Sequence, residues 1–207
     1  MPRHPDPDLE ERVLKAAQVL WKRGGEKALT MRAVARAAHT NTPAVYRRFK
    51  NRQDLIRGLL KRIVERLGEQ FASGTLEQMA ESYVDYALRE PHAYDLFYTY
   101  AHELAPTKVD GRPRPIREAR ANFALVERLL ARELGGSPED YTQLALALWA
   151  TLHGTTMLLL SKGITGHEEA LRAACRRAVK VLLDGAAEFS AGKGSGRDGP
   201  GREGDPR

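Results

Sequence analysis

Residues 30–55 constrain the fold of this chain more than any other stretch of the sequence. Their pattern predicts two short helices joined by a tight turn, with a third helix starting directly afterwards. Thr30 has a side chain suited to cap the first helix. The second helix can begin at Asn41 or Thr42, with Pro43 just inside its first turn, where a missing N–H costs nothing. The connection between them is so short that the chain must turn a sharp corner, as in a helix-turn-helix motif.

The second of these helices has an apolar inner side and a basic outer side. Val45 and Phe49 lie four residues apart and are expected to face inward. The outer faces are left to Thr42, Pro43, Ala44, Tyr46, Arg47 and Arg48. A short helix with a small-residue tip and basic flanks fits the major groove of DNA. The alternative is that any small helical bundle contains two helices and a turn.

Charge favours the DNA-binding interpretation. Residues 1–62 contain 15 Lys and Arg against 6 Asp and Glu, a net charge of +9, whereas residues 63–207 contain 18 against 21, a net charge of −3. Positive charge is therefore concentrated on the segment that holds the helix-turn-helix, where it would neutralise phosphates.

The rest of the chain predicts an all-α fold of about nine helices, with no β-strand pattern. Besides the two short helices, the expected helices cover residues 9–23, 51–71, 76–89, 91–104, 116–134, 138–162 and 167–187. The proline-rich segment 106–115 is expected to be a loop. We predict an N-terminal DNA-binding domain over 1–54, a linking helix over 51–71, a C-terminal effector-binding and dimerisation domain over 72–189, and a disordered tail over 190–207.

The sequence contains no pattern typical of a membrane protein or an enzyme. We find no 18-residue apolar run and no apolar N-terminal leader, so a cytoplasmic location with no membrane partner is expected. Cys175 is a single cysteine among apolar residues and is expected to be buried. Phosphate loops, metal-spaced ligands and a nucleophile elbow are all missing. We therefore predict no catalytic residue, no metal and no cofactor, although a small helical enzyme stays a weak alternative.

Aromatic residues gather in the predicted C-terminal domain, with five tyrosines and one phenylalanine between residues 83 and 100. Tyrosine is an awkward core residue because a buried hydroxyl requires a partner. We therefore predict a small-molecule pocket lined by some of Tyr83, Tyr86, Phe97, Tyr98, Phe123, Trp149 and His153. The alternative is that these rings only fill the core, and a lone His such as His153 is more often a core histidine than a ligand.

The last two predicted helices have apolar faces that look too wide for one intramolecular partner. We expect two such helices from each subunit to form a four-helix dimer interface. The predicted interface residues are Leu144, Leu148, Leu152, Leu159, Leu171, Ala178 and Leu182.

The segment from Tyr46 to Leu55, YRRFKNRQDL, resembles the end of the recognition helix in the TetR family of transcriptional regulators, and the resemblance covers roughly residues 8–60. Trp149, His153 and Gly154 also resemble the Trp-x-x-x-His-Gly signature of one C-terminal domain class of that family. Two departures concern the turn, where His39 replaces the usual Gly and Thr40 replaces an apolar residue. His39 must either accept a left-handed conformation or reshape the corner.

The resemblance implies a homodimer that binds a palindromic operator and a small-molecule effector. It implies base contacts by Thr42, Pro43, Ala44 and Arg47, and phosphate contacts by Tyr46, Arg48, Lys50 and the start of the preceding helix. The implied DNA-binding set is Thr30, Arg32, Asn41, Thr42, Pro43, Ala44, Tyr46, Arg47, Arg48 and Lys50. Release of a repressor by its effector is favoured over activation, and an effector-independent architectural DNA-binding protein is the main alternative.

Overall fold

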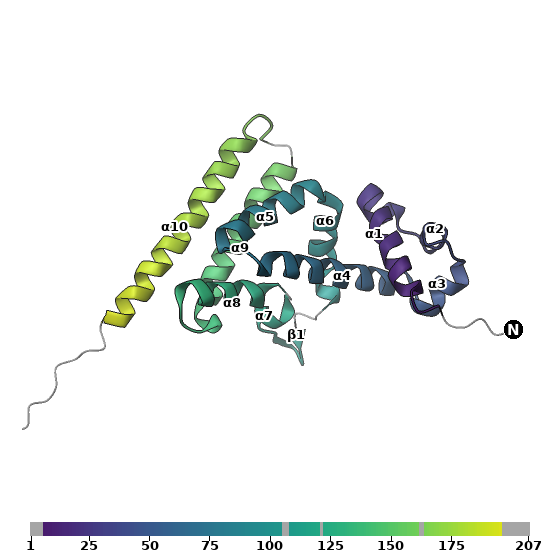
Figure 1. The fold of residues 1–207 in the computed structure, drawn as a ribbon, viewed down its shortest axis with the longest axis horizontal. Helices are drawn as coiled ribbons and strands as arrows, with labels where there is room; N and C mark the ends of the chain where they lie inside the picture. The colour runs from purple at the N-terminus through teal and green to yellow at the C-terminus, as the bar shows by residue number, and fades with distance from the viewer. Residues whose placement is uncertain (1–5, 105–107, 121, 162–163, 196–207) are drawn as a thin grey trace, which may run out of the picture. The chain divides into compact units, whose positions relative to one another are not determined.

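The computed structural model describes residues 6–104, 108–120, 122–161 and 164–195, with side chains as far as residue 188. Within these ranges the chain is almost entirely helical (Figure 1). The helices are α1 (Leu9–Ala28), α2 (Met31–Ala37), α3 (Thr42–Arg48), α4 (Arg52–Ala72), α5 (Leu76–Arg89), α6 (Pro91–Tyr100), α7 (Ile116–Ala119), α8 (Phe123–Leu134), α9 (Thr142–Leu160) and α10 (Glu168–Ser195). There are also two 3₁₀ turns. The turn η1 (Ala101–Glu103) follows α6 directly, and η2 (Pro138–Tyr141) directly precedes α9.

The all-α prediction is confirmed, and three details of it are wrong. Residues 108–113 form a small hairpin of strands β1 (Lys108–Val109) and β2 (Arg112–Pro113) in the segment expected to be a loop. The helix expected over 116–134 is two helices, because Arg120 is extended, with φ −132° and ψ 106°. The last helix, α10, continues to Ser195, beyond the helix end predicted at residue 187. Residues 196–207 lie outside the described ranges.

The described chain divides into two compact units. The first contains residues up to Gly74 together with Glu81–Leu125, and the second contains Thr75–Ala80 and the residues from Val126 onwards. The boundaries predicted for the domains, at residues 54, 72 and 189, remain predictions, since a compact unit is not the same as a functional domain.

In the first unit, the three N-terminal helices enclose one apolar core. Val13, Val34, Val45 and Leu55 are fully buried, and Phe49 is buried beside them, as the spacing of Val45 and Phe49 predicts. Trp21 extends the core toward α6, where its indole Nε1 donates a hydrogen bond to the His92 carbonyl at 2.6 Å.

Helix α1 breaks at Gly24 and Gly25 and then continues for one more turn. Gly25 adopts φ +58°, a left-handed conformation that favours glycine. The backbone is also closely approached there, because a Cβ at Gly25 would lie 3.2 Å from Nδ1 of His92. The pair therefore both turns the chain and admits the side chain from α6.

In the second unit, the polar sequence before α9 defines how the chain enters that helix. Gly135 and Gly136 both have positive φ, and Ser137 and Asp140 form a capping box. Helices α9 and α10 then lie side by side (Figure 1). Cys175 is buried, as expected from its apolar neighbours.

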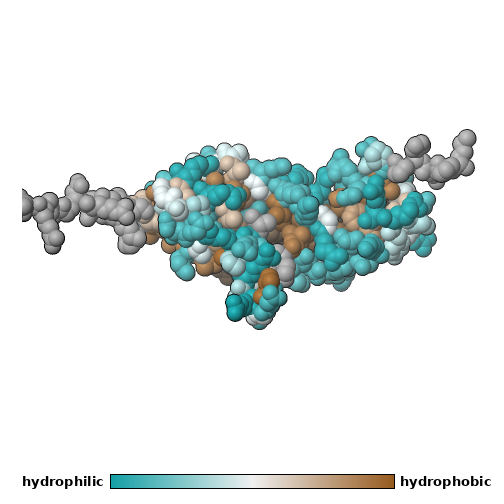
Figure 2. Space-filling view, turned by 90° about the horizontal axis from the view of Figure 1, so that it is seen from below, coloured by the Kyte–Doolittle hydropathy of each residue, from teal (hydrophilic) through white to brown (hydrophobic). Residues whose placement is uncertain are grey.

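The segment Pro138–Leu160 is long and apolar enough to cross a membrane by length and composition alone. Leu148, Leu152 and Leu159 of this segment are buried, and 33% of its most apolar 18-residue window is buried within the protein. One such helix is weak evidence for a membrane span, because the core helix of a globular protein has the same length and composition. Figure 2 shows hydrophilic residues over much of one face of the molecule, with hydrophobic residues in separate patches.

Two glycines test the packing directly. A Cβ at Gly58 in α4 would lie 2.9 Å from the Phe49 ring and 3.1 Å from Leu14, whereas a Cβ at Gly185 in α10 meets no atom within 4 Å. We expect Gly58→Ala to lower the free energy of unfolding by about 1–3 kcal/mol through overpacking. Gly185→Ala should raise it by up to about 1 kcal/mol through helix propensity. Urea unfolding of both variants measures the difference, and equal effects would show that Phe49 and α4 are not closely packed.

Candidate nucleic-acid interface

The turn between α2 and α3 is fully hydrogen-bonded despite its unusual sequence. His39 has φ +52°, so it accepts the left-handed conformation rather than reshaping the corner. The N–H of Thr40 donates to the Ala35 carbonyl at 2.9 Å, and the N–H of His39 donates to the Arg36 carbonyl at 3.2 Å. These are the two bonds of a Schellman motif. The angle at which α3 leaves α2 is therefore defined by backbone hydrogen bonds.

Side-chain caps begin both helices of the motif. The Thr30 hydroxyl accepts the N–H of Ala33 at 3.1 Å, and the Asn41 side-chain oxygen accepts the N–H of Ala44 at 2.9 Å. Asn41 rather than Thr42 is therefore the cap of α3, and Pro43 follows in the first turn.

Most of the predicted DNA-binding residues lie on the surface. Seven of them lie in α3, at its cap or just after its end, and are exposed or half-buried. Thr30 and Arg32 are exposed at the start of α2. The full accessible set is Thr30, Arg32, Asn41, Thr42, Pro43, Tyr46, Arg47, Arg48 and Lys50. Ala44 is the exception, because it is only 4% exposed. The outer-face prediction for Ala44 does not hold for its accessibility, although Ala44 still lines the open groove beside α3. Its contact with bases stays a prediction.

A broad open groove of about 1290 Å³ runs beside α3 and is strongly basic. It is lined by Arg12, Arg36, Arg47, Arg48 and His39, among others. Arg12 and Arg36 come from α1 and α2, and sequence reasoning did not assign them to the interface. The charge of residues 1–62 was the available signal, but it does not say which arginines share a surface.

One carboxylate occupies part of this basic groove. Asp6 forms an ion pair with Arg12, with Oδ2 and Nη1 2.8 Å apart, and its carbonyl oxygen accepts a hydrogen bond from Arg48 at 3.4 Å. The hydrogen bond from Arg12 holds the pKa of the Asp6 carboxyl below its ordinary value. Asp6 is therefore an anion at a surface that would otherwise present only positive charge.

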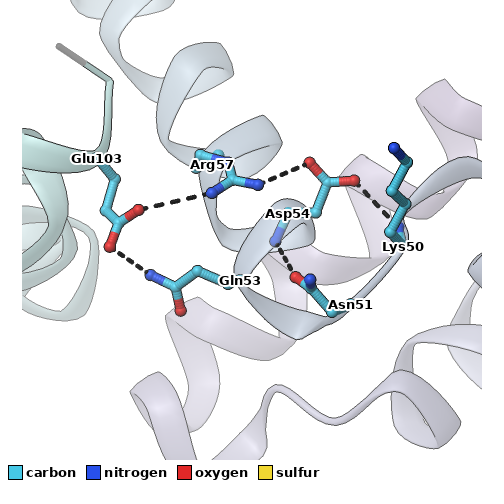
Figure 3. A network of polar contacts seen from close by, with 6 residues as sticks. All are labelled: Lys50, Asn51, Gln53, Asp54, Arg57 and Glu103. Carbon is cyan, nitrogen blue, oxygen red and sulfur yellow. Dashed lines mark hydrogen bonds and ion pairs between the residues drawn. The ribbon is translucent and has the colours of Figure 1, made fainter.

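A polar network connects the end of α3 to α4 and η1 (Figure 3). Asp54 accepts the backbone N–H of Lys50 at 3.0 Å, and its own N–H donates to the Asn51 side chain at 2.8 Å. Arg57 lies 3.2 Å from Asp54 and 3.7 Å from Glu103. Gln53 donates a hydrogen bond to Glu103 at 2.7 Å. The recognition helix is thus tied to α4, and α4 is tied to the residues after α6.

The tyrosines predicted to line a ligand pocket do not form one group. The Tyr83 hydroxyl lies 3.2 Å from that of Tyr94 and is also hydrogen-bonded to that of Tyr98. Burial raises the pKa of Tyr83 far above its ordinary value, so its hydroxyl stays protonated. The Phe97 ring packs edge-on against Tyr98 with centroids 5.2 Å apart. These hydroxyls partner one another, which answers the difficulty of burying tyrosine in a core.

Tyr86 lies in a different place, in a pocket with residues of α1 and α4. Phe123 is buried. Trp149 and His153 belong to the second unit, with ring centroids 6.5 Å apart, and burial lowers the pKa of His153. A single pocket lined by some of the seven predicted ligand residues stays a prediction.

Three of the predicted dimer-interface leucines are buried within their own subunit, so they are not accessible on a single chain, and the predicted interface itself stays a prediction. Leu148, Leu152 and Leu159 are 2%, 3% and 9% exposed, because that side of α9 packs inside the second unit. Leu144, Leu171, Ala178 and Leu182 are half-buried. The exposed apolar side chains on these two helices are instead Met157, Leu158 and Val181, at 48%, 49% and 62%.

The chain thus combines a capped helix-turn-helix, a basic groove and a helical body, an arrangement that defines a DNA-binding regulator of the helix-turn-helix class. Two family profiles match it: "Bacterial regulatory proteins, tetR family" over residues 13–59, and "Tetracyclin repressor-like, C-terminal domain" over residues 76–189. The second match covers more than half of the chain and includes Trp149 to Gly154. The chain belongs to the TetR family of bacterial regulatory proteins.

Solved structures have the same fold. A transcriptional regulator from Rhodococcus sp. RHA1 shares 18% identity and a TM-score of 0.63, over 86% of this chain and 97% of that one. The multidrug binding protein EbrR complexed with ethidium has 20% sequence identity and a TM-score of 0.61, over 86% of this chain and 99% of that one. A TetR variant from Acinetobacter baumannii AYE in complex with minocycline has 19% sequence identity and a TM-score of 0.55, over 86% of this chain and 96% of that one. No curated protein matches the chain at a significant level.

Removing the Asp6 carboxylate tests whether it competes with DNA phosphates. We expect Asp6→Asn to tighten DNA binding by about two- to fivefold at moderate salt, the range of an exposed ion pair. Fluorescence anisotropy with a labelled duplex measures this. Glu81→Gln, which removes the same charge from an exposed position on α5, is the matched control. An equal gain in both variants would attribute the effect to net charge and not to the groove.

Proposed function

We propose that this protein is a cytoplasmic transcriptional repressor that binds a palindromic operator as a homodimer and is released by a small-molecule effector. The observation that carries the proposal is the presentation of α3. Its cap, its Schellman turn and its link to Asp54 are all satisfied, while Pro43, Tyr46 and Arg47 stay exposed. A helix held in this way can enter a major groove without reorganising.

The exposed residues of α3 suit two kinds of contact. Pro43 offers apolar contact to a thymine methyl, and Arg47 can donate to guanine. Arg48, Lys50 and the arginines of the groove, Arg12 and Arg36, are placed to contact phosphates, which position the protein without selecting a sequence.

Homodimerisation would give the two recognition helices that a palindromic operator requires. Half-sites one helical turn apart are separated by about 34–36 Å, which one seven-residue helix cannot span. Exposed Met157, Leu158 and Val181 on α9 and α10 are the apolar side chains available to a second copy of the chain. We therefore place the dimer interface on these exposed residues and on half-buried Leu144, Leu171, Ala178 and Leu182, without the buried leucines.

An effector is supported by the solved structures of similar fold, since EbrR is described as a multidrug binding protein and two of its complexes contain imidazole or ethidium. The effector would act as an allosteric ligand. It needs to favour the non-binding conformation by only a few kcal/mol to shift most of the population. An architectural DNA-binding protein without an effector is the second candidate, and insensitivity of DNA binding to small molecules would favour it.

Selection of bound duplexes from random DNA tests the DNA-binding proposal. We expect a palindromic consensus. Arg47→Ala should relax the selection at one base pair of each half-site and cost about 1–3 kcal/mol. Arg48→Ala should weaken binding evenly across sequences and reduce the slope of log K against log salt by about 0.9 for each phosphate lost. Recovery of no consensus would favour the architectural alternative.

Substitution of an exposed residue tests the dimer interface. Val181→Glu should give monomers in light scattering and should weaken operator binding by more than about tenfold, because one half-site contact is lost with the partner. Val19→Glu, the same change at an exposed position of α1 that is 46% accessible, is the control and should remain dimeric. Dimers of Val181→Glu at micromolar concentration would place the interface elsewhere.

A further inference from the structure

A pocket of about 560 Å³ lies within the first unit, between α1, α4 and α5. Ile63 and Leu67, both buried, line it from α4, and Tyr86 lines it from α5. Its volume is in the range of small-molecule sites, about 300–1,000 Å³. The pocket is distinct from the cluster of Tyr83, Tyr94 and Tyr98, whose hydroxyls bond to one another.

The hydroxyl of Tyr86 is a hydrogen-bond donor that this pocket leaves available. Tyr86 is half-buried, and burial together with the negative charge of Glu90 raises the pKa of its hydroxyl. Among the described residues, no side chain or backbone group forms a hydrogen bond with it. A phenol in such surroundings remains protonated and donates readily to an incoming acceptor.

Arg66 supplies positive charge beside that hydroxyl. Its charge acts on Tyr86, yet within the described part of the chain its guanidinium forms no hydrogen bond or ion pair. The negative charge of Glu90 is already compensated, because Glu90 forms an ion pair with Lys22 of α1. Arg89 and Glu69 are the other charged groups that line the pocket, and both are exposed. The lining therefore contains three cations and two carboxylates.

We propose that this pocket binds an organic monocarboxylate with an apolar, preferably aromatic, body. The carboxylate would accept hydrogen bonds from Arg66 and from the Tyr86 hydroxyl, and a planar guanidinium matches a carboxylate in a bidentate geometry. The body of the ligand would lie against Ile63 and Leu67. A cation at the same place would face three cationic side chains against two carboxylates, one of which is already paired with Lys22, so an anion is the better complement.

The position of the pocket gives such a ligand a route to DNA binding. Lys22 pairs with Glu90 at the rim, and the neighbouring Trp21 donates to the His92 carbonyl at 2.6 Å. These two contacts join α1, part of the helix-turn-helix segment, to the start of α6. A carboxylate in the pocket competes with Glu90 for Lys22. This inference deepens the proposed function and rests on it only for the consequence for operator release.

The experiment uses the full-length protein and two probes of nearly the same size and shape, one anionic and one neutral. Isothermal titration calorimetry is performed with 2-naphthoate and with 2-naphthamide, in the absence of DNA. We expect 2-naphthoate to bind at least about tenfold more tightly, because bonds to a charged acceptor are the stronger ones. Arg66→Gln should remove this preference, and Tyr86→Phe should weaken 2-naphthoate by about fivefold.

Controls separate the site from unspecific effects of charge or folding. Arg23→Gln removes an equal charge from an exposed position of α1 outside the pocket and should leave the affinity unchanged. Thermal unfolding without ligand checks that each variant is folded. Equal affinity for the two probes, unchanged affinity in Arg66→Gln, or preference for 2-naphthylmethylammonium would overturn the inference.

Anisotropy with the selected operator then separates this inference from the proposed function. Binding of 2-naphthoate that also lowers operator affinity supports both. Binding that depends on Arg66 and leaves operator affinity unchanged upholds the carboxylate site and contradicts its role as an effector site. Failure to bind any naphthyl probe overturns the site, while a different molecule that releases the operator would leave the proposed function intact.

Discussion

The carboxylate of Asp54 is the contact on which the presentation of the recognition helix depends. It accepts the last free N–H after α3, at Lys50, and it also pairs with Arg57 one turn further along α4. Because α3 has only seven residues, it has little stability of its own. Its orientation comes from the burial of Val45 and Phe49 in the core and from its two ends, the Schellman turn at His39 on one side and Asp54 on the other. Whatever moves the first turn of α4 therefore moves the surface that would contact DNA.

Two sets of contacts join the N-terminal helices to the rest of the first unit. One contains Arg57, Gln53 and Glu103, and the other contains the Lys22–Glu90 pair and the bond from Trp21 to His92. Most of these groups are partly exposed, and exposed ion pairs contribute about 0–1 kcal/mol each. Under the proposed function, contacts of this strength are weak enough for a bound effector to change them. A regulator requires this property, since its two conformations must differ by only a few kcal/mol.

Local signals predicted the elements of this fold well. The caps Thr30 and Asn41 are confirmed, because each depends on a few neighbouring residues. The errors concern tertiary context. Nothing in the sequence near Arg120 marks a break, since neither Gly nor Pro is present there. An apolar face such as that of Leu148 and Leu152 looks the same whether it packs against the same chain or against a partner. Likewise, a group of tyrosines gives the same sequence pattern whether their hydroxyls bond to one another or line a pocket.

The burial of Ala44 has a consequence for how such a protein can be selective. With Ala44 buried, few residues of α3 are left for the proposed base contacts: exposed Pro43 and Arg47 and half-buried Thr42. Each well-made base contact discriminates by about 1–3 kcal/mol, so one copy of α3 would separate its site from other DNA only weakly. The basic groove with Arg12 and Arg36 would add affinity for any duplex and thus no selectivity. Under the proposed function, selectivity would come from doubling the base contacts with two copies of α3 held at a fixed separation. The proposed dimer interface on α9 and α10 and the proposed base contacts of α3 therefore depend on each other, because without a partner subunit the short helix would have too little to recognise.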